Sequence, residues 1–183
     1  GFGYDGSNTA VTNLVSNAGV VATDTTGVGT ARREVAACGY GGDKGIFGYG
    51  EATLSMTNLV SNAGVVASDV SGVGTARQDL AACSYGGDKG IFGFGEENLS
   101  LGLLGMTNLV SNAGVVASDV TAVGTARKDS AACEYGGDKG IFGFGNDGSK
   151  TAVTNLVSNT GVVATDVTGV GTVRSDLAAC SFN

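Results

Sequence analysis

The stretch TNLVSNAGVVASD, residues 57–69, decides the fold, because close copies of it occur four times in this 183-residue sequence. The copies begin at Thr12, Thr57, Thr107 and Thr154, which gives a period of 45 to 50 residues. Such a period is typical of the blades of β-propellers, and it also lies near that of the helical HEAT and armadillo repeats. The local chemistry of each copy has to decide between strands and helices.

The apolar runs within each repeat are short, four to seven residues, and are bounded by Gly, Asn, Asp or Ser. A helical repeat needs apolar residues at positions i, i+3 and i+4 over about ten residues or more. Here the runs are rich in Val, Ile, Phe, Tyr and Thr, which favour strands. We therefore predict four strands per repeat, and in the second repeat these cover residues 35–40, 44–49, 56–60 and 65–69.

The two ends of the sequence match different parts of one repeat. Residues 1–7 match residues 143–149, and residues 179–183 match the end of a first strand. We expect one all-β domain over residues 1–183, a four-bladed β-propeller with four antiparallel strands per blade. Its ring would be closed by the C-terminal first strand pairing with the N-terminal second, third and fourth strands, which removes open sheet edges. The alternative is a part of a longer open array.

Composition and charge exclude several classes of protein. Glycine accounts for 33 residues, proline is absent, and 42% of the residues are apolar, which fits neither collagen nor a disordered linker. The net charge is −7 and the ten basic residues are spread along the chain, so we expect no nucleic-acid partner. No apolar run approaches the roughly 18 residues of a membrane-spanning helix, so we expect no membrane insertion.

A second repeated stretch carries a resemblance to known families. Residues 77–95 contain Ala-Ala-x-x-Tyr-Gly-Gly-Asp-Lys-Gly-Ile-Phe-Gly-Phe-Gly, which resembles a Kelch-type propeller blade without the tryptophan that usually closes it. Together with TNLVSN, this text is similar to repeat proteins encoded by aquatic bacteriophages. The resemblance implies a propeller on a virion or an extracellular surface, and it implies no particular chemistry.

One arginine per repeat follows an aspartate by eight residues and precedes another acidic residue by two. The four are Arg32, Arg77, Arg127 and Arg174. One interpretation is a ring of guanidinium and carboxylate groups at a channel mouth that binds an anion or a sugar. The other is a set of ion pairs and loop hydrogen bonds between blades.

One cysteine per repeat follows two alanines. The four are Cys38, Cys83, Cys133 and Cys180. We expect small, buried and inert thiols on crowded inner strands, and no cofactor. Four thiolates converging on zinc are a weaker alternative, because the paired C-x₂-C spacing of zinc sites is absent. Disulfides between neighbouring blades are another.

The loops between the second and third strands vary most from repeat to repeat, at residues 5–10, 51–55, 96–105 and 146–152. Variable loops on one face of a rigid frame are where binding is expected. The longest of them supplies the binding residues that we predict together with the four arginines: Glu96, Glu97, Leu99, Leu101, Leu103 and Leu104. Alternatively, this loop folds back over its own blade.

The sequence lacks the usual equipment of an enzyme, since it has no histidine and no acid pair that stands outside the repeat. We predict a non-enzymatic structural or binding module, an appendage or adhesin that contacts a protein in a larger assembly or a surface glycan. One alternative is a multivalent lectin with sugar platforms at Tyr49, Phe94 and Phe144. A less favoured alternative is a glycan hydrolase that uses Glu51, Glu96 and Glu97.

Overall fold

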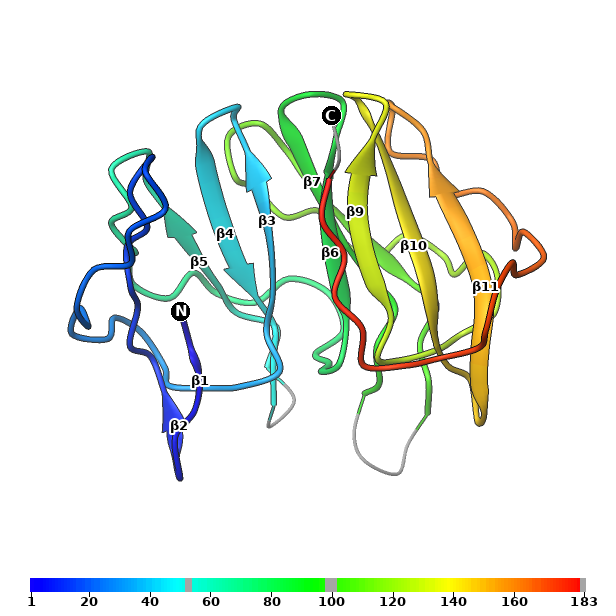
Figure 1. The fold of residues 1–183 in the computed structure, drawn as a ribbon, viewed down its shortest axis with the longest axis horizontal. Helices are drawn as coiled ribbons and strands as arrows, with labels where there is room; N and C mark the ends of the chain where they lie inside the picture. The colour runs from blue at the N-terminus through cyan, green and yellow to red at the C-terminus, as the bar shows by residue number, and fades with distance from the viewer. Residues whose placement is uncertain (52–53, 98–101, 182–183) are drawn as a thin grey trace.

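The structure is a computed structural model that describes residues 1–51, 54–97 and 102–181. It consists of a short N-terminal hairpin followed by three sheets in chain order (Figure 1). The strands are β1 (Gly3–Tyr4), β2 (Asn8–Thr9), β3 (Ala36–Tyr40), β4 (Lys44–Gly48), β5 (Thr57–Val60), β6 (Ala81–Tyr85), β7 (Lys89–Gly93), β8 (Thr107–Val110), β9 (Ala131–Tyr135), β10 (Lys139–Asn146) and β11 (Lys150–Val157).

Each sheet contains three antiparallel strands, and the second strand of the repeat lies in the centre. The orders are β3-β4-β5, β6-β7-β8 and β9-β10-β11. The register repeats too, because Ala36 pairs with Gly48 in the first sheet and Ala81 pairs with Gly93 in the second. The prediction of an all-β protein built from repeated antiparallel units is therefore confirmed.

The predicted fourth strand of each repeat is an extended segment with isolated bridges instead of a continuous ladder. In the second repeat, Val60 pairs with Val66 and Thr57 pairs with Val70, and no strand is assigned between these bridges. The Asn58 side chain donates to the Ala67 carbonyl at 3.1 Å. A side chain therefore takes an acceptor that a regular ladder would use, which limits the pairing to three strands.

Among the described residues, the sheets follow one another in chain order and a closed ring is not shown. The innermost strands β3, β6 and β9 lie next to one another in that order (Figure 1). The Asp176 amide donates to the Asp129 carbonyl at 3.1 Å, and residues 177–179 lie beside β9. Within the described residues, the C-terminal segment does not pair with the N-terminal hairpin.

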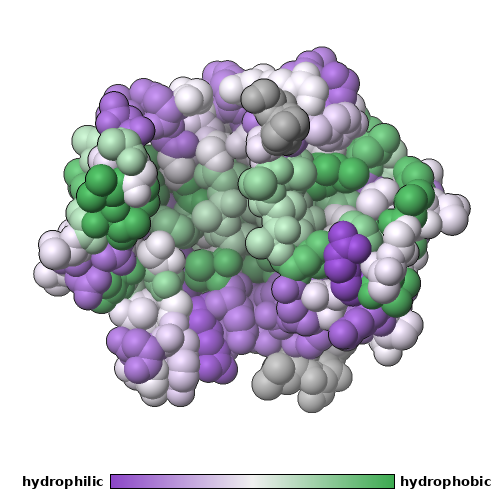
Figure 2. Space-filling view, in the orientation of Figure 1, coloured by the Kyte–Doolittle hydropathy of each residue, from purple (hydrophilic) through white to green (hydrophobic). Residues whose placement is uncertain are grey.

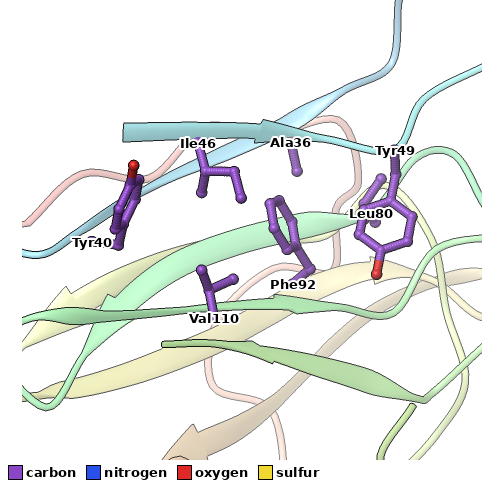
Figure 3. Packing of buried hydrophobic residues seen from close by; sticks show 7 residues of the cluster. All are labelled: Ala36, Tyr40, Ile46, Tyr49, Leu80, Phe92 and Val110. Atoms are coloured by element: carbon purple, nitrogen blue, oxygen red, sulfur yellow. The ribbon is translucent and has the colours of Figure 1, made fainter. Parts of the chain in front are cut away.

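The hydrophobic core lies between neighbouring sheets. One cluster joins the first two sheets and consists of Ala36, Tyr40, Ile46, Tyr49, Leu80, Phe92 and Val110 (Figure 3). In this view Ile46 and Val110 point toward one another from facing sheets. A second cluster, which includes Phe94 and Phe142, joins the second sheet to the third. A single sheet cannot bury its apolar face alone, so each repeat depends on its neighbours.

Glycine at the end of the central strand allows the closest contact between sheets. A Cβ atom on Gly48 would lie 2.7 Å from Cζ of Phe92, and one on Gly93 would lie 2.8 Å from Cζ of Phe142. Both distances are shorter than carbon atoms tolerate without a shift of the neighbouring ring. The absence of a side chain on Gly48 and Gly93 therefore leaves room for the phenylalanine ring of the next sheet.

The close contact between Gly48 and the Phe92 ring can be tested by adding one methyl group. We expect Gly48→Ala to lower the free energy of unfolding by about 1–3 kcal/mol, because it overpacks the contact with Phe92. Gly143→Ala is the matched control, because its Cβ would meet only Cγ2 of Thr154, at 3.2 Å. Urea denaturation of both variants measures the difference. Equal losses of unfolding free energy in the two variants would contradict the role of Gly48 in making room for the Phe92 ring.

Candidate binding edge

The variable loops all lie along one edge of the row. This edge, here called the loop edge, comprises residues 5–7, 49–51, 54–56, 94–97, 102–106 and 147–149, and it runs along the bottom of Figure 1. The turns within each repeat that hardly vary lie along the opposite edge. Much of the lower edge is hydrophilic, below a band of apolar residues (Figure 2). The predicted binding residues Leu99 and Leu101 lie outside the described residues.

The two described ends of the longest loop pair with each other. Glu96 pairs with Leu103 through a β-bridge, and the Leu104 amide donates to the Gly95 carbonyl at 2.8 Å. Leu103 and Leu104 are half-buried, while Glu97 is exposed. Among Glu96, Glu97, Leu103 and Leu104, the predicted binding residues of this loop that the structure describes, Glu97 is the most exposed to solvent.

Glu96 is committed to contacts with neighbouring residues. It is 6% exposed, and its carboxylate lies 3.0 Å from Nζ of Lys128 in the next repeat and accepts from Nε2 of Gln78 at 3.3 Å. One repeat earlier, Glu51 has the corresponding role, since its carboxylate pairs with Arg33 and accepts from Nδ2 of Asn8 at 3.1 Å. These carboxylates tie adjacent repeats together along the loop edge.

The repeated arginine is buried between repeats. Arg32 has no exposed surface, and its guanidinium donates to the Tyr49 carbonyl at 2.8 Å, to the Thr30 carbonyl at 3.0 Å and to Oδ1 of Asn58 at 2.6 Å. Arg77 and Arg127 are equally buried in the equivalent places. Each arginine therefore bonds to the sheet that follows it in the chain.

The same arginines stack on the sheet that precedes them. The guanidinium of Arg77 lies 4.3 Å from the centre of the Tyr49 ring, and that of Arg127 lies 3.9 Å from the Phe94 ring. These aromatic residues have positive φ angles, 62° for Tyr49 and 63° for Phe94, which non-glycine residues seldom adopt. The cation–π contact and the packed ring stabilise this backbone, whose strain is on the order of 1 kcal/mol or more.

An aspartate completes each inter-repeat contact. Asp69 accepts from the Thr30 amide at 2.9 Å, from the Thr30 hydroxyl at 2.8 Å and from Nδ2 of Asn58 at 2.8 Å. Burial by itself would raise the pKa of Asp69, but the hydrogen bonds from Asn58 and Thr30 outweigh it and lower the pKa. In the next two repeats the equivalent threonine and asparagine side chains donate to Asp119 and to Asp166.

This geometry favours the second interpretation of the arginine series, contacts between repeats. A ligand cannot reach Arg32, Arg77 or Arg127 while these side chains have no exposed surface. Arg174 differs, because it is exposed, donates to the Thr172 carbonyl at 3.0 Å and stacks 3.7 Å from the centre of the Phe144 ring. It presents on the last sheet the same group that the other three bury.

An acidic column runs across the repeats at the start of the innermost strands. It consists of Glu34, Asp79, Asp129 and Asp176, which all have positive φ angles and line one shallow cavity of about 190 Å³. The Asp129 amide donates to the Asp79 carbonyl at 3.0 Å. Burial and then repulsion by Glu34 and Asp129 raise the pKa of Asp79 to about 6. The sequence shows an acidic residue two positions after each arginine. Only the stacking of the repeats shows that these acidic residues line a common cavity.

Three of the cysteines lie on the innermost strands β3, β6 and β9, and Cys180 lies in the C-terminal segment. Cys83 is buried, Cys38 and Cys133 are half-buried, and Cys180 is exposed, and all four are free. Burial raises the pKa of Cys38 to about 12 and also raises that of Cys83, which disfavours the thiolate that binds metal. Among the residues that the structure describes, no three His, Cys, Asp or Glu side chains gather as a metal site would require.

Comparison with known proteins found no family model that matches this chain and no curated protein similar to it. In the described part of the chain, no helix has the length and hydropathy needed to cross a membrane. The candidate site therefore rests on the geometry of the repeats themselves.

The buried arginine can be tested against its exposed equivalent. We expect Arg77→Ala to lower the free energy of unfolding by about 3–5 kcal/mol, because the Asn108 and Thr75 oxygens lose a buried donor. Arg174→Ala should cost about 1 kcal/mol or less, because its side chain is exposed. Chemical denaturation of the two variants measures both values. A large loss of unfolding free energy in Arg174→Ala would contradict this expectation. It would show that stacking on the Phe144 ring stabilises the protein even where no following sheet accepts hydrogen bonds from the arginine.

The raised pKa of Asp79 predicts a pH dependence of stability. The folded protein holds a proton on Asp79 up to about pH 6, whereas the unfolded chain releases it near pH 4. Stability should therefore fall as pH rises from about 4 to 6, by on the order of 1–2 kcal/mol from this group. Lys128 opposes the shift, while Glu34, Asp129 and Glu96 contribute to it.

Asp79→Asn should remove this part of the pH dependence and increase stability at pH 7. Asparagine also tolerates the φ angle of 53° at this position. Thermal unfolding of both proteins between pH 4 and 7 checks the prediction. Parallel curves for the two proteins would contradict it.

Proposed function

We propose that this protein is a non-enzymatic structural or binding module whose loop edge contacts a partner. The observation that carries the proposal is that the recurring and the variable residues of the repeat lie in different places. The residues that recur from repeat to repeat are used in the contacts between repeats, whereas the residues that differ cluster on the loop edge. Variation at one edge of a uniform frame is the arrangement of a recognition surface.

The alternative of a glycan hydrolase has less support. Such an enzyme needs two carboxyl groups that face a substrate at a separation of about 5–10 Å. Glu96 is buried against Lys128, and Glu51 is held by Arg33 and Asn8. Two of the three candidate carboxylates are therefore occupied by structural contacts.

The alternative of a lectin with sugar sites between blades also has less support. Such a site stacks the sugar on an exposed aromatic ring. Tyr49 and Phe94 have no exposed surface, and Phe144 is half-buried beneath the guanidinium of Arg174. A glycan remains a candidate partner for the loop edge, where exposed polar side chains such as Asp5, Glu97 and Asp147 lie.

We also propose that the sheets act as blades of a propeller and that the protein works on a virion or an extracellular surface. The innermost strands of successive sheets adjoin one another, as the inner strands of propeller blades do. The resemblance of the repeat to Kelch-type blades and to phage-encoded repeats supports the same assignment.

The binding proposal is tested by exchanging one loop for another from the same chain. Residues 96–105 are replaced by the sequence of residues 146–152, which forms a tight hairpin on the neighbouring sheet. Binding of both proteins is measured on a glycan array and on intact bacterial cells by flow cytometry. We expect at least a tenfold loss of binding in the exchange variant with little change in thermal stability. Binding that survives the exchange would move the site away from this loop.

A control on the unvarying edge and an activity assay complete the test. Asn112→Ala removes a hydrogen bond to Asp88 on the opposite edge and should leave binding unchanged. Release of reducing sugar from the same glycans, reduced in Glu51→Gln or Glu97→Gln, would instead support the hydrolase.

A further inference from the structure

The edge opposite the loop edge is nearly the same in every repeat. This edge, here called the turn edge, carries two tight turns per repeat, and the first of them joins the innermost strand to the central strand along the top of Figure 1. In the second repeat the two turns are residues 41–44 and 61–65. The equivalent turns, all within the described part of the chain, are residues 86–89, 111–115, 136–139 and 158–162, together with residues 16–20 of the first repeat.

A hydrogen-bond network holds the two turns of a repeat together. The Asp43 carboxylate accepts from Nζ of Lys44 at 2.9 Å and from Nδ2 of Asn62 at 3.0 Å, so it bridges the two turns. The same network recurs twice, at Asp88, Lys89 and Asn112 and at Asp138, Lys139 and Asn159. A surface that is ordered before binding loses less conformational entropy when it binds. The turn edge therefore presents its polar groups in a fixed arrangement.

Each network has spare hydrogen-bonding capacity for both donors and acceptors. A lysine ammonium has three donors, and that of Lys44 makes one hydrogen bond to the described residues. A carboxylate has about four acceptor sites, and that of Asp43 uses two of them for the side chains of Lys44 and Asn62. A surface that offers ammonium donors and carboxylate acceptors side by side is complementary to itself, because a lysine of one copy can pair with an aspartate of another.

The charges of the turn edge cancel. It holds three aspartates and three lysines, whereas the whole chain has a net charge of −7. The excess negative charge therefore lies elsewhere, and the loop edge contributes to it through Glu51, Glu97 and Asp147. Two copies of the chain repel each other least when their turn edges meet and their loop edges point apart.

An exposed valine closes the second turn of every repeat. The Ser61 amide donates to the Val65 carbonyl at 2.9 Å, and Val65 is 66% exposed. Val20, Val115 and Val162 occupy the same place in the other repeats and are 64–65% exposed. The exposure is the same in the inner repeats as in the first and the last, so it is a property of the turn and does not depend on the neighbouring repeats. Recurring apolar side chains beside balanced charges are typical of a protein interface.

The turn edge is also large enough for a stable contact. Three turns of four residues and four turns of five residues amount to 32 residues. A protein interface of standard size uses about 20–30 residues from each partner. The turn edge can therefore supply one side of such an interface without any contribution from the loop edge.

We propose that a second copy of this chain docks on the turn edge across a two-fold axis. Both copies use the same surface, as two-fold symmetry requires. Lys44, Lys89 and Lys139 donate to the aspartates of the second copy, and the exposed valines of the two copies are buried in the contact. The two loop edges face away from each other and stay free, so this proposal does not rest on the proposed function.

The experiment measures the association of the 183-residue protein by sedimentation velocity between about 1 µM and about 100 µM. We expect a dimer whose population rises with concentration. Changing three of the exposed valines together, by Val65→Ser, Val115→Ser and Val162→Ser, should raise the dissociation constant at least tenfold, because an apolar contact is lost.

A second set of valines provides the matched control. Val70, Val120 and Val167 are 42–45% exposed but lie outside the turns, so changing these three to serine should leave the dissociation constant unchanged. Thermal unfolding establishes that both triple variants are folded.

Chemical labelling tests the contact without any substitution. The unaltered protein is treated with a succinimidyl ester at both ends of the concentration range, and mass spectrometry measures the acylation of each lysine. Lys44, Lys89 and Lys139 should react severalfold more slowly in the dimer, whereas Lys150, which is exposed next to the loop edge, should react at the same rate. This measurement decides the question if a triple variant fails to fold.

Three results would overturn the proposal. The first is a monomer at every concentration. The second is a dimer that the turn-edge serines weaken no more than the control serines do. The third is slower labelling of Lys150 with unchanged labelling of the three turn-edge lysines, which would place the contact near the loop edge. The first two results leave the proposed function standing, because the loop exchange tests that function separately, and a failure of the loop exchange would in turn leave the dimer standing.

Discussion

The arginine buried between successive repeats is the contact on which the rest of the structure depends. Each of the three guanidinium groups stacks on an aromatic ring of the preceding repeat. Arg32 also donates to a backbone carbonyl and an asparagine of the following sheet, Arg77 to the asparagine and Arg127 to the carbonyl. A buried cation is costly unless its donors are satisfied, so this contact requires the asparagine, the threonine carbonyl and the aspartate in fixed places. The regular spacing of the sheets follows from that requirement.

This constraint explains which residues recur and which vary. Asn58, Asp69 and Thr30 complete one contact, and Asn108, Asp119 and Thr75 complete the next. In the third, Asn155 and Thr125 donate to Asp166, while Arg127 donates to the carbonyls of Thr125 and Phe144. Strand-end glycines such as Gly48 admit the ring of the next sheet. The guanidinium groups contact Tyr49 and Phe94 at the start of two of the variable loops. The other described residues of the loop edge make no hydrogen bond to the guanidinium groups of Arg32, Arg77 or Arg127, so they are free to differ, and recognition is compatible with a uniform frame.

Much of this fold could be predicted from the sequence, because the repeat and its short β-rich runs indicate sheets directly. The prediction of a regular fourth strand was wrong, since the Asn58 side-chain amide donates to the Ala67 carbonyl, which a regular ladder would use. The closed ring expected from the matching ends is not shown by the described residues, in which the C-terminal segment makes no pairing with the N-terminal hairpin. The burial of Arg77 and the meeting of Asp79 with Asp129 depend on stacking between sheets, which no single repeat reveals.

The pairwise nature of the contacts has a consequence for the length of such an array. Each arginine joins only consecutive repeats, so one added repeat brings one added interface of the same kind and disturbs none of the others. The distance between neighbouring positions on the loop edge is then set by the frame and stays constant whatever the number of repeats. In an array of this design, duplication of a repeat in the gene changes the number of loop positions and leaves the distance between neighbouring positions unchanged.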